Sequence, residues 1–247
     1  MKNITFDKIL EDAVAWFNAL PESTQKQLKQ ELEHGAANLQ NNKQLKADIA
    51  VYGKIHQDKL LHAFQNIPKT VWEEPNVSII DYGAGQGIAE MVLADFLDLM
   101  MFDSDFIKDI TLIEPSHCSL NRSLDYLSSF FLDSELFPLN ITESQLKYND
   151  LTPKSRTIVH LFSNVVDLDS FEGNNAARFI NLENDKNHIV VCVSPYYQEE
   201  TRGKRMEAFG NKLDSCFQIY KLEKHTDNWD KPYSCQIHIY MSKHYLC

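Results

Sequence analysis

The sequence predicts an α/β fold in which a mostly parallel sheet of about seven strands closes with an antiparallel hairpin. From residue 76 onward, short apolar and β-branched runs alternate with stretches of helical periodicity, which favours a parallel sheet with helices on both faces. The last two runs, 216–225 and 234–244, are separated by a turn-rich segment and form the expected hairpin. Residues 1–70 show helical periodicity alone and are expected to form a helical N-terminal cap.

Three helices are expected in this cap. Apolar residues recur at helical spacing over 4–20, and Pro21 ends that helix or begins a second one that reaches about residue 39. A third helix is expected over 45–67, although Gly53 lowers its intrinsic stability. A proline-bracketed linker follows, and the second unit then covers residues 75–247.

Each strand of the second unit is predicted from a short apolar run bounded by turn residues. The third strand is the least defined, because its register within the sequence is unclear. The expected strands are 76–81, 109–114, one within 139–148, 157–164, 188–195, 216–225 and 234–244, and the helices between them are 88–101, 120–132, 170–184 and 203–213.

Composition limits the classes of function. Lys and Arg number 24 and Asp and Glu 35, so the net charge is −11, which disfavours holding nucleic acid by attraction to its backbone alone. The five cysteines form no C-x-x-C pair, which argues against a structural zinc site or a disulfide scaffold. No signal-peptide pattern and no bilayer-length apolar run is present. We therefore expect a cytoplasmic protein with reduced thiols, no metal and no membrane partner.

The clearest motif is Ile-Ile-Asp-Tyr-Gly-Ala-Gly-Gln-Gly, which begins at Ile79. A strand ends at Asp81, the alternate positions Gly83, Gly85 and Gly87 follow, and a helix begins at once. Glycines allow positive φ and let a ligand approach the main chain, and the helix start offers N–H groups. The spacing is not the G-x-G-x-x-G of dinucleotide-binding loops, so a nicotinamide enzyme is a weaker alternative. A second alternative is that the motif forms a tight strand-to-helix turn that binds no ligand.

Together with its preceding acid, this loop resembles the first motif of class I S-adenosylmethionine-dependent methyltransferases. The resemblance covers about residues 75–247 and implies a Rossmann-like fold with S-adenosylmethionine as the cofactor. It also implies that Asp81, Gly83, Gly85 and Gly87 hold the methionine end of that cofactor. The reaction of this family is an in-line displacement at a sulfonium methyl group, in which positioning does most of the work.

Two further positions are assigned through this resemblance. Glu114 ends the second strand, and an acid at that tip can accept both hydroxyls of a ribose. In the family an acid at this place has that role. Asn149 and Asp150 are expected to follow the third strand, where a polar residue of the family binds the adenine amino group. The same two residues also favour turns, so the turn stays an equal alternative.

The end of the fourth strand supplies the catalytic candidates. In this fold the fourth strand points towards the transferred methyl group, so Ser163 and Asn164 are expected to face cofactor and acceptor. A hydroxyl and an amide can orient an acceptor nitrogen or oxygen. His160 lies in the middle of the same strand. It is the only obvious base near that point, although a buried core histidine is the favoured interpretation.

Aromatic residues outside these motifs are candidates for the acceptor pocket. Tyr196 and Tyr197 follow the fifth strand. Tyr52 and His56 lie one turn apart on the third cap helix and share a face. They can cover the cofactor as a lid, and an interface helix explains them equally well.

These motifs predict an S-adenosylmethionine-dependent methyltransferase whose acceptor is a small molecule or a protein. One alternative is a non-catalytic S-adenosylmethionine-binding or interaction module. The unusual end of the fourth strand favours this alternative. Another is an RNA methyltransferase, because residues 1–70 hold nine Lys and eight acidic residues and are less acidic than the rest.

Overall fold

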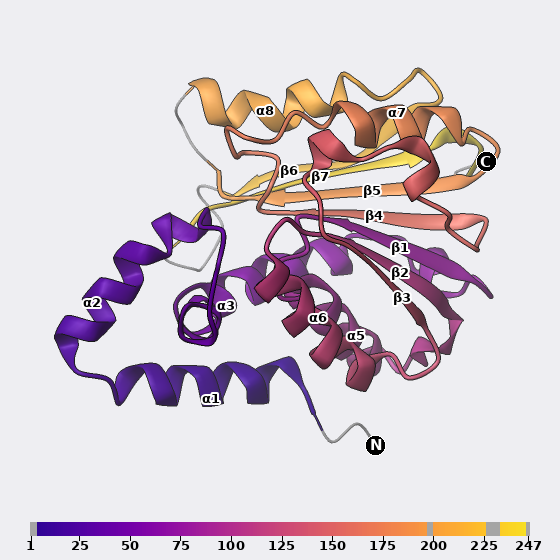
Figure 1. The fold of residues 1–247 in the computed structure, drawn as a ribbon. Helices are drawn as coiled ribbons and strands as arrows, with labels where there is room; N and C mark the ends of the chain where they lie inside the picture. The colour runs from indigo at the N-terminus through magenta and orange to yellow at the C-terminus, as the bar shows by residue number, and fades with distance from the viewer. Residues whose placement is uncertain (1–3, 197–199, 226–232, 246–247) are drawn as a thin grey trace.

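A single sheet forms the centre of the molecule (Figure 1). The computed structural model describes residues 4–196, 200–225 and 233–245. The seven strands of the sheet are β1 Val77–Tyr82, β2 Ile107–Ile113, β3 Glu135–Leu139, β4 Thr157–Ser163, β5 Asn187–Ser194, β6 Phe217–His225 and β7 Cys235–Ser242. Their order is β3-β2-β1-β4-β5-β7-β6. Only β7 runs antiparallel to its neighbours, so the predicted parallel sheet with a closing hairpin is confirmed.

Helices cover both faces of this sheet. They are α1 Phe6–Asn18, α2 Glu22–Glu31, α3 Asn42–Gln65, α4 Lys69–Trp72, α5 Ile88–Leu99, α6 His117–Phe130, α7 Asn174–Leu182 and α8 Glu200–Gly210. Figure 1 shows α5 and α6 on one face and α7 and α8 on the other. Because side chains alternate along a strand, Ile79 of β1 packs in the core that includes α5, and Ile80 packs in the core that includes α7.

The three predicted helices of the cap are present as α1, α2 and α3, although α2 ends at Glu31 and not near residue 39, because Glu33 and His34 adopt positive φ. Gly53 lies in the middle of α3, where an added Cβ would come within 3.0 Å of the Leu10 side chain of α1. The missing side chain lets the two helices pack closely, and this packing offsets the low helix propensity of glycine. Leu60 and Phe64 of α3 share one apolar core with Ile79 of β1, so the cap is docked on the sheet unit.

The third strand lies earlier than predicted. It was expected within 139–148, and the structure places β3 at Glu135–Leu139. Pro138 disguises the run, because proline cannot donate a hydrogen bond within a sheet. β3 is the edge strand of the sheet, where proline is tolerated. The residues expected to form the strand instead contain two short 3-10 helices, Glu143–Gln145 and Tyr148–Asp150.

The parallel strands end together at one edge of the sheet. Asp81 of β1 pairs with Leu112 of β2 and with Leu161 of β4, while Ser163 of β4 pairs with Val193 of β5. The loops that follow these strands therefore meet at one place, which is where open α/β sheets bind their ligands.

In the part of the chain that the structure describes, no helix combines the length and the apolar character needed to cross a bilayer. The four described cysteines, Cys118, Cys192, Cys216 and Cys235, are free thiols.

Candidate functional site

The loop of residues 83–87, here called the glycine loop, contains three left-handed glycines. The φ angle is +76° at Gly83, +55° at Gly85 and +76° at Gly87, a region that residues with a Cβ adopt only at a cost. An added Cβ on Gly83 would lie 2.9 Å from Val165, and one on Gly87 3.2 Å from a side chain of α6. These two glycines therefore permit close internal packing. An added Cβ on Gly85 would meet no described atom within 4 Å, so the backbone of Gly85 borders open space.

Glu114, which follows β2, lies beside this open space. Its Oε2 accepts a hydrogen bond from the Gly85 N–H at 2.9 Å, and its Oε1 accepts one from the Ser116 N–H at 2.7 Å. Burial raises the pKa of Glu114, and the two backbone donors offset part of that rise. Each carboxylate oxygen has a second lone pair. Glu114 can therefore also accept hydrogen bonds from a ligand that lies next to Gly85.

Asp81, at the end of β1, interacts with a second buried acid, Glu90 of α5. Both side chains are at most 1% exposed. Within the described residues, Asp81 Oδ1 and the two Glu90 carboxyl oxygens have no hydrogen-bond partner other than the opposite acid of this pair. Burial and the neighbouring Glu90 raise the pKa of Asp81 well above its usual range, and burial raises the pKa of Glu90 to about 7. The pair is therefore suited to a positively charged ligand.

One side chain fastens the start of α3 to the glycine loop. Gln86 Nε2 donates to the Leu45 carbonyl oxygen and to the Asp48 carboxylate, both at 3.0 Å. Burial raises the pKa of Asp48 to about 7. The hydrogen bond from Gln86 lowers this pKa, and the charge of Glu114 raises it. Two acids thus border the glycine loop, Asp48 from the cap and Glu114 from the sheet.

Tyr52 and His56 continue the same face of α3, as predicted from their spacing. Their rings are stacked, with centroids 6.3 Å apart and planes inclined by 19°, and both side chains are half-buried. Burial and the nearby Lys59 lower the pKa of His56 to about 3, so its ring is neutral at physiological pH. The two residues lie between Asp48 and Lys59 along the helix. Their role as a lid stays a prediction.

Lys59 connects the cap to the end of β4. It is 1% exposed, and its Nζ donates a hydrogen bond to Asn164 Oδ1. Asn164 has a left-handed backbone, with φ +57°, and its Nδ2 donates to Ser163 Oγ at 3.0 Å. Burial lowers the pKa of Lys59 to about 8, although Cys235 and Asp167 act in the opposite direction. Buried lysines and strained non-glycine residues are concentrated at functional sites, so the end of β4 is part of the candidate site.

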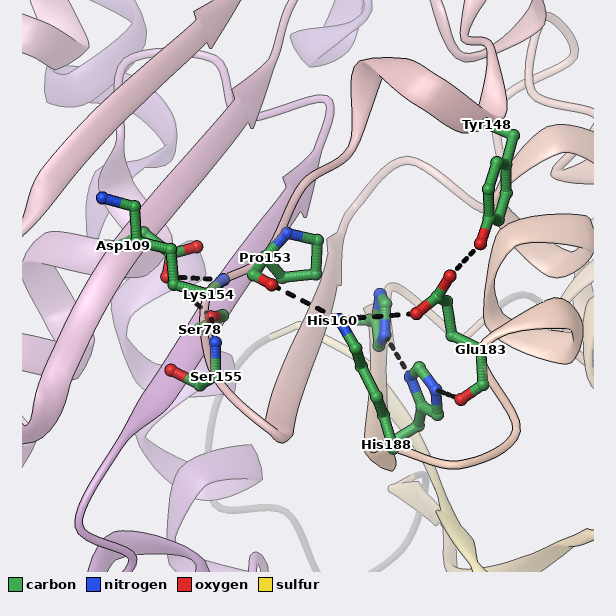
Figure 2. A network of polar contacts seen from close by, with 10 residues as sticks. Ser78, Asp109, Tyr148, Pro153, Lys154, Ser155, His160, Glu183 and His188 are labelled. Atoms are coloured by element: carbon green, nitrogen blue, oxygen red, sulfur yellow. Dashed lines mark hydrogen bonds and ion pairs between the residues drawn. The ribbon is translucent and has the colours of Figure 1, made fainter.

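His160 lies inside the core and not at the edge of the sheet. Figure 2 shows its ring directed at His188 of β5, with His160 Nε2 and His188 Nδ1 2.9 Å apart. The Tyr82 hydroxyl is 3.2 Å from His160 Nδ1, and His188 Nε2 is 2.8 Å from the carbonyl oxygen of Glu183. Burial lowers the pKa of His160 well below its usual range. Both ring nitrogens are engaged in the core, which favours the structural role over that of a base.

Asn149 and Asp150 do not follow β3 directly, so the premise of their assignment is wrong. Asn149 lines a cavity of about 620 Å³ between its own 3-10 helix and α7, and no residue of the glycine loop lines that cavity. The residue that does follow β3 is Asn140, whose Nδ2 donates to the Glu114 carbonyl oxygen at 2.9 Å. Binding of adenine by Asn149 or Asp150 stays a prediction, and Asn140 is the nearer neighbour of Glu114.

The loop after β5 reaches the same edge of the sheet. The Tyr196 N–H donates to Ser234 Oγ at 3.0 Å, which ties this loop to the start of β7. Ser194 Oγ donates to Asp167 Oδ1 at 2.9 Å, which joins the ends of β4 and β5. Tyr197 lies outside the described residues.

Several residues of the site carry no motif that reveals them in the sequence. Asp48 and Asp167 lie in a helix and a loop without any motif, and Gln86 lies inside the glycine motif, where only the glycines carry a signal. Glu90 offers the one usable signal, because it is an acid inside the otherwise apolar first half of α5. Among the described residues, no cluster of His, Cys, Asp or Glu has the arrangement of a metal site.

Comparisons with known proteins agree with this architecture. No protein-family model and no curated protein matches the chain. A candidate class I S-adenosylmethionine-dependent methyltransferase from Listeria monocytogenes aligns with 97% of this chain and 69% of its own length, with a TM-score of 0.50 and 12% identity. The fold is therefore the Rossmann-like fold of class I methyltransferases.

Two other solved structures are similar at lower scores. An S-adenosylmethionine-dependent methyltransferase from Leishmania major covers 94% of this chain and 82% of its own, with a TM-score of 0.47 and 9% identity. The magnesium protoporphyrin IX methyltransferase from Synechocystis covers 95% and 97%, with a TM-score of 0.46 and 13% identity.

Proposed function

We propose that the chain is an S-adenosylmethionine-dependent methyltransferase that holds its cofactor between the glycine loop and α3. The observation that carries this proposal is the open space beside the left-handed Gly85. A side chain at this position would project into that space. A left-handed glycine with no internal packing beside it lets a ligand approach the backbone closely.

The charges around this space fit the cofactor. S-adenosylmethionine carries an ammonium and a sulfonium group, and the buried Asp81 and Glu90, whose pKa values are raised in the ligand-free protein, can ionise next to such a cation. Glu114 and Asp48 can accept hydrogen bonds from ribose hydroxyls. A pyrophosphate-containing dinucleotide would place its negative charges next to the same acids, which is unfavourable. The acids therefore favour S-adenosylmethionine over a nicotinamide cofactor.

The bound cofactor would supply an electrophilic methyl group, and the residues of this chain would do the positioning. Gly85 lets the main chain approach the ligand, and Glu114 fixes the ligand through hydrogen bonds. The hydrogen bonds from Gln86 hold α3 against the loop. Ser163 and Asn164, at the neighbouring strand end, orient the acceptor. In such reactions the correct placement of two reactants supplies a large part of the rate enhancement.

A small molecule or a protein is the acceptor that the chain suits best. The net charge of −11 opposes the approach of a nucleic-acid backbone. The candidate site itself adds four acids, Asp48, Asp81, Glu90 and Glu114, at the cofactor end. An RNA acceptor would have to overcome this repulsion.

Calorimetric titration with S-adenosylhomocysteine tests the proposal. The wild-type protein should bind in the micromolar to millimolar range typical of enzyme ligands. Gly85→Val should weaken binding about 100-fold or more, because its side chain occupies the ligand space. Met101→Val is the matched control: its φ is +60° and its side chain is exposed beyond the end of α5, so the same β-branched residue enters a left-handed position away from the glycine loop. Folded wild-type protein that binds no S-adenosylhomocysteine would contradict the proposal.

A further inference from the structure

Lys59 determines which way the Asn164 amide is turned. A lysine side chain has hydrogens to donate and no acceptor in its charged form. The Asn164 atom that faces Lys59 Nζ must therefore be the carbonyl oxygen Oδ1, as observed. The amide nitrogen is then directed elsewhere, and Asn164 Nδ2 donates to Ser163 Oγ. The orientation of the Asn164 amide therefore follows from the chemistry of Lys59, although the oxygen and nitrogen of an isolated amide are hard to tell apart.

This orientation leaves hydrogen-bond donors at the end of β4. Ser163 Oγ accepts from Asn164, so its own hydroxyl hydrogen is available for another partner. Asn164 Nδ2 has a second hydrogen, and the Lys59 ammonium has two beyond the one given to Asn164. Ser163 and Asn164 are both half-buried, so this end of the strand is accessible. Lys59, Asn164 and Ser163 together form what is here called the donor cluster.

The donor cluster is positively charged at neutral pH. The pKa of Lys59, lowered by burial to about 8, keeps its amine mostly protonated at pH 7. The groups that face it are Asp167 after β4, Cys235 of β7 and the neutral His56 of α3. Within the described residues Lys59 forms no ion pair, and Asp167 is already hydrogen-bonded to Ser194. A buried ammonium without a direct counter-ion is costly, and a bound anion would remove that cost.

The donor cluster also lies next to the proposed cofactor space. Val165, the residue after Asn164, packs so closely on the glycine loop that a Cβ on Gly83 would come within 2.9 Å of it. The cluster therefore belongs to the acceptor end of the site, while Asp48, Asp81, Glu90 and Glu114 mark the cofactor end.

Building on the proposed function, we infer that Lys59, Asn164 and Ser163 bind an anionic oxygen of the methyl acceptor, such as a carboxylate. The cluster offers several free donors and one positive charge, which repels an amine or a guanidinium group and binds a carboxylate. Lys59 thereby selects the acceptor class, and it reaches the site from the cap. The cap is then part of the acceptor site as well as a cover for the cofactor.

The charge at sulfur provides a test that needs no knowledge of the acceptor. S-adenosylmethionine is positively charged at sulfur and S-adenosylhomocysteine is neutral there, so the ratio of their dissociation constants measures the charge next to the reacting centre. Calorimetry at pH 7 should give a ratio that favours S-adenosylmethionine about 10-fold more in Lys59→Met than in wild type, because the variant lacks the positive charge that repels the sulfonium. Lys43→Met, an exposed lysine at the start of α3, should leave the ratio unchanged.

Acetate serves as the probe for the anion. Replacing sodium chloride with sodium acetate at equal ionic strength should tighten S-adenosylmethionine about threefold relative to S-adenosylhomocysteine in wild type, the size of a weak ion pair. The effect should vanish in Lys59→Met. Equal ratios in wild type and Lys59→Met would overturn the placement of Lys59. A changed ratio without an acetate effect would overturn the carboxylate class.

Lys59→Arg keeps the test decisive if Lys59→Met does not fold. Arginine stays charged at every accessible pH, so its ratio should not change between pH 7 and 9 through this position. In wild type, the ratio of the two dissociation constants should shift in favour of S-adenosylmethionine between pH 7 and pH 9, because Lys59 loses its proton. This shift should be about 10-fold larger than in Lys59→Arg. An identical pH profile in both proteins would overturn the inference. Folded wild-type protein that binds neither ligand would instead contradict the proposed function itself.

Discussion

Gln86 of the glycine loop donates a hydrogen bond to the Asp48 carboxylate of α3 across 3.0 Å, although 38 positions separate the two residues. The same Nε2 also holds the Leu45 carbonyl oxygen at 3.0 Å. The helical cap is therefore attached directly to the loop that forms the proposed cofactor site. Any change in this attachment should affect stability and ligand binding together.

Replacing Gln86 tests that attachment. Gln86→Leu removes both hydrogen bonds and leaves the Leu45 carbonyl oxygen and the Asp48 carboxylate without their donor, which should cost about 1–3 kcal/mol of unfolding free energy. S-adenosylhomocysteine should bind more weakly, since α3 no longer lies fixed over the loop. Urea unfolding and calorimetry measure the two effects. Gln27→Leu, in which an exposed side chain loses its bond to Glu31, should change neither.

Glu90 should make the ligand-free protein less stable as the pH rises. Its pKa is about 7 in the folded protein and 4.5 as the ordinary value. A group whose pKa is raised on folding contributes stability at low pH that is lost as the pH approaches the folded value. Glu90→Gln cannot ionise, so its unfolding free energy should fall less between pH 5 and pH 8 than that of wild type.

Urea unfolding at the two pH values measures this difference. Glu11→Gln, at an exposed position of α1, should keep the wild-type pH dependence. A Glu90→Gln profile that parallels wild type would show that Glu90 does not carry the excess proton.

Binding of the cofactor should release protons. A cation next to Asp81, Glu90 and Asp48 lowers the pKa values that burial has raised in the ligand-free protein. Near pH 6.5, the heat of S-adenosylmethionine binding should therefore depend on the ionisation enthalpy of the buffer, with net proton release. Glu90→Gln should release fewer protons. Binding heats that are the same in all buffers would contradict the role of these acids.

His160 should matter for stability and not for binding. His160→Phe fills similar space but leaves the Tyr82 hydroxyl and His188 Nδ1 without their partner, at an expected cost of about 1–3 kcal/mol. The dissociation constant of S-adenosylhomocysteine should stay within about twofold of wild type. Such a change in binding free energy is well below the 1.4 kcal/mol that corresponds to a tenfold change. His117→Phe, at an exposed position, is the control. A large loss of binding with normal stability would restore His160 to the reacting centre.

The elements that the sequence predicts are those whose signal is local. β1, β2, β4 and β5 are buried runs with clear ends, and the hairpin of β6 and β7 is marked by its turn-rich separator. The sequence does not locate β3, because Pro138 argues against a strand unless the strand is known to lie at an edge. That knowledge comes only from the order of strands in the folded sheet.

The candidate site divides in the same way. Gly85 and Glu114 are recognisable because the loop and the strand tip are short, continuous patterns. The contact between Lys59 and Asn164 joins positions 105 residues apart, and no local pattern announces it. Glu90 is similar, because its partner Asp81 becomes apparent only when α5 folds back on β1.

A crystal structure with S-adenosylhomocysteine would show directly whether the space beside Gly85 holds the cofactor. Electron density for the ligand is expected against the Gly85 backbone, with its ribose hydroxyls near Glu114 or Asp48 and its sulfur towards Asn164. Density in the cavity beside Asn149 instead, or a glycine loop closed by the protein's own side chains with no ligand present, would contradict this placement.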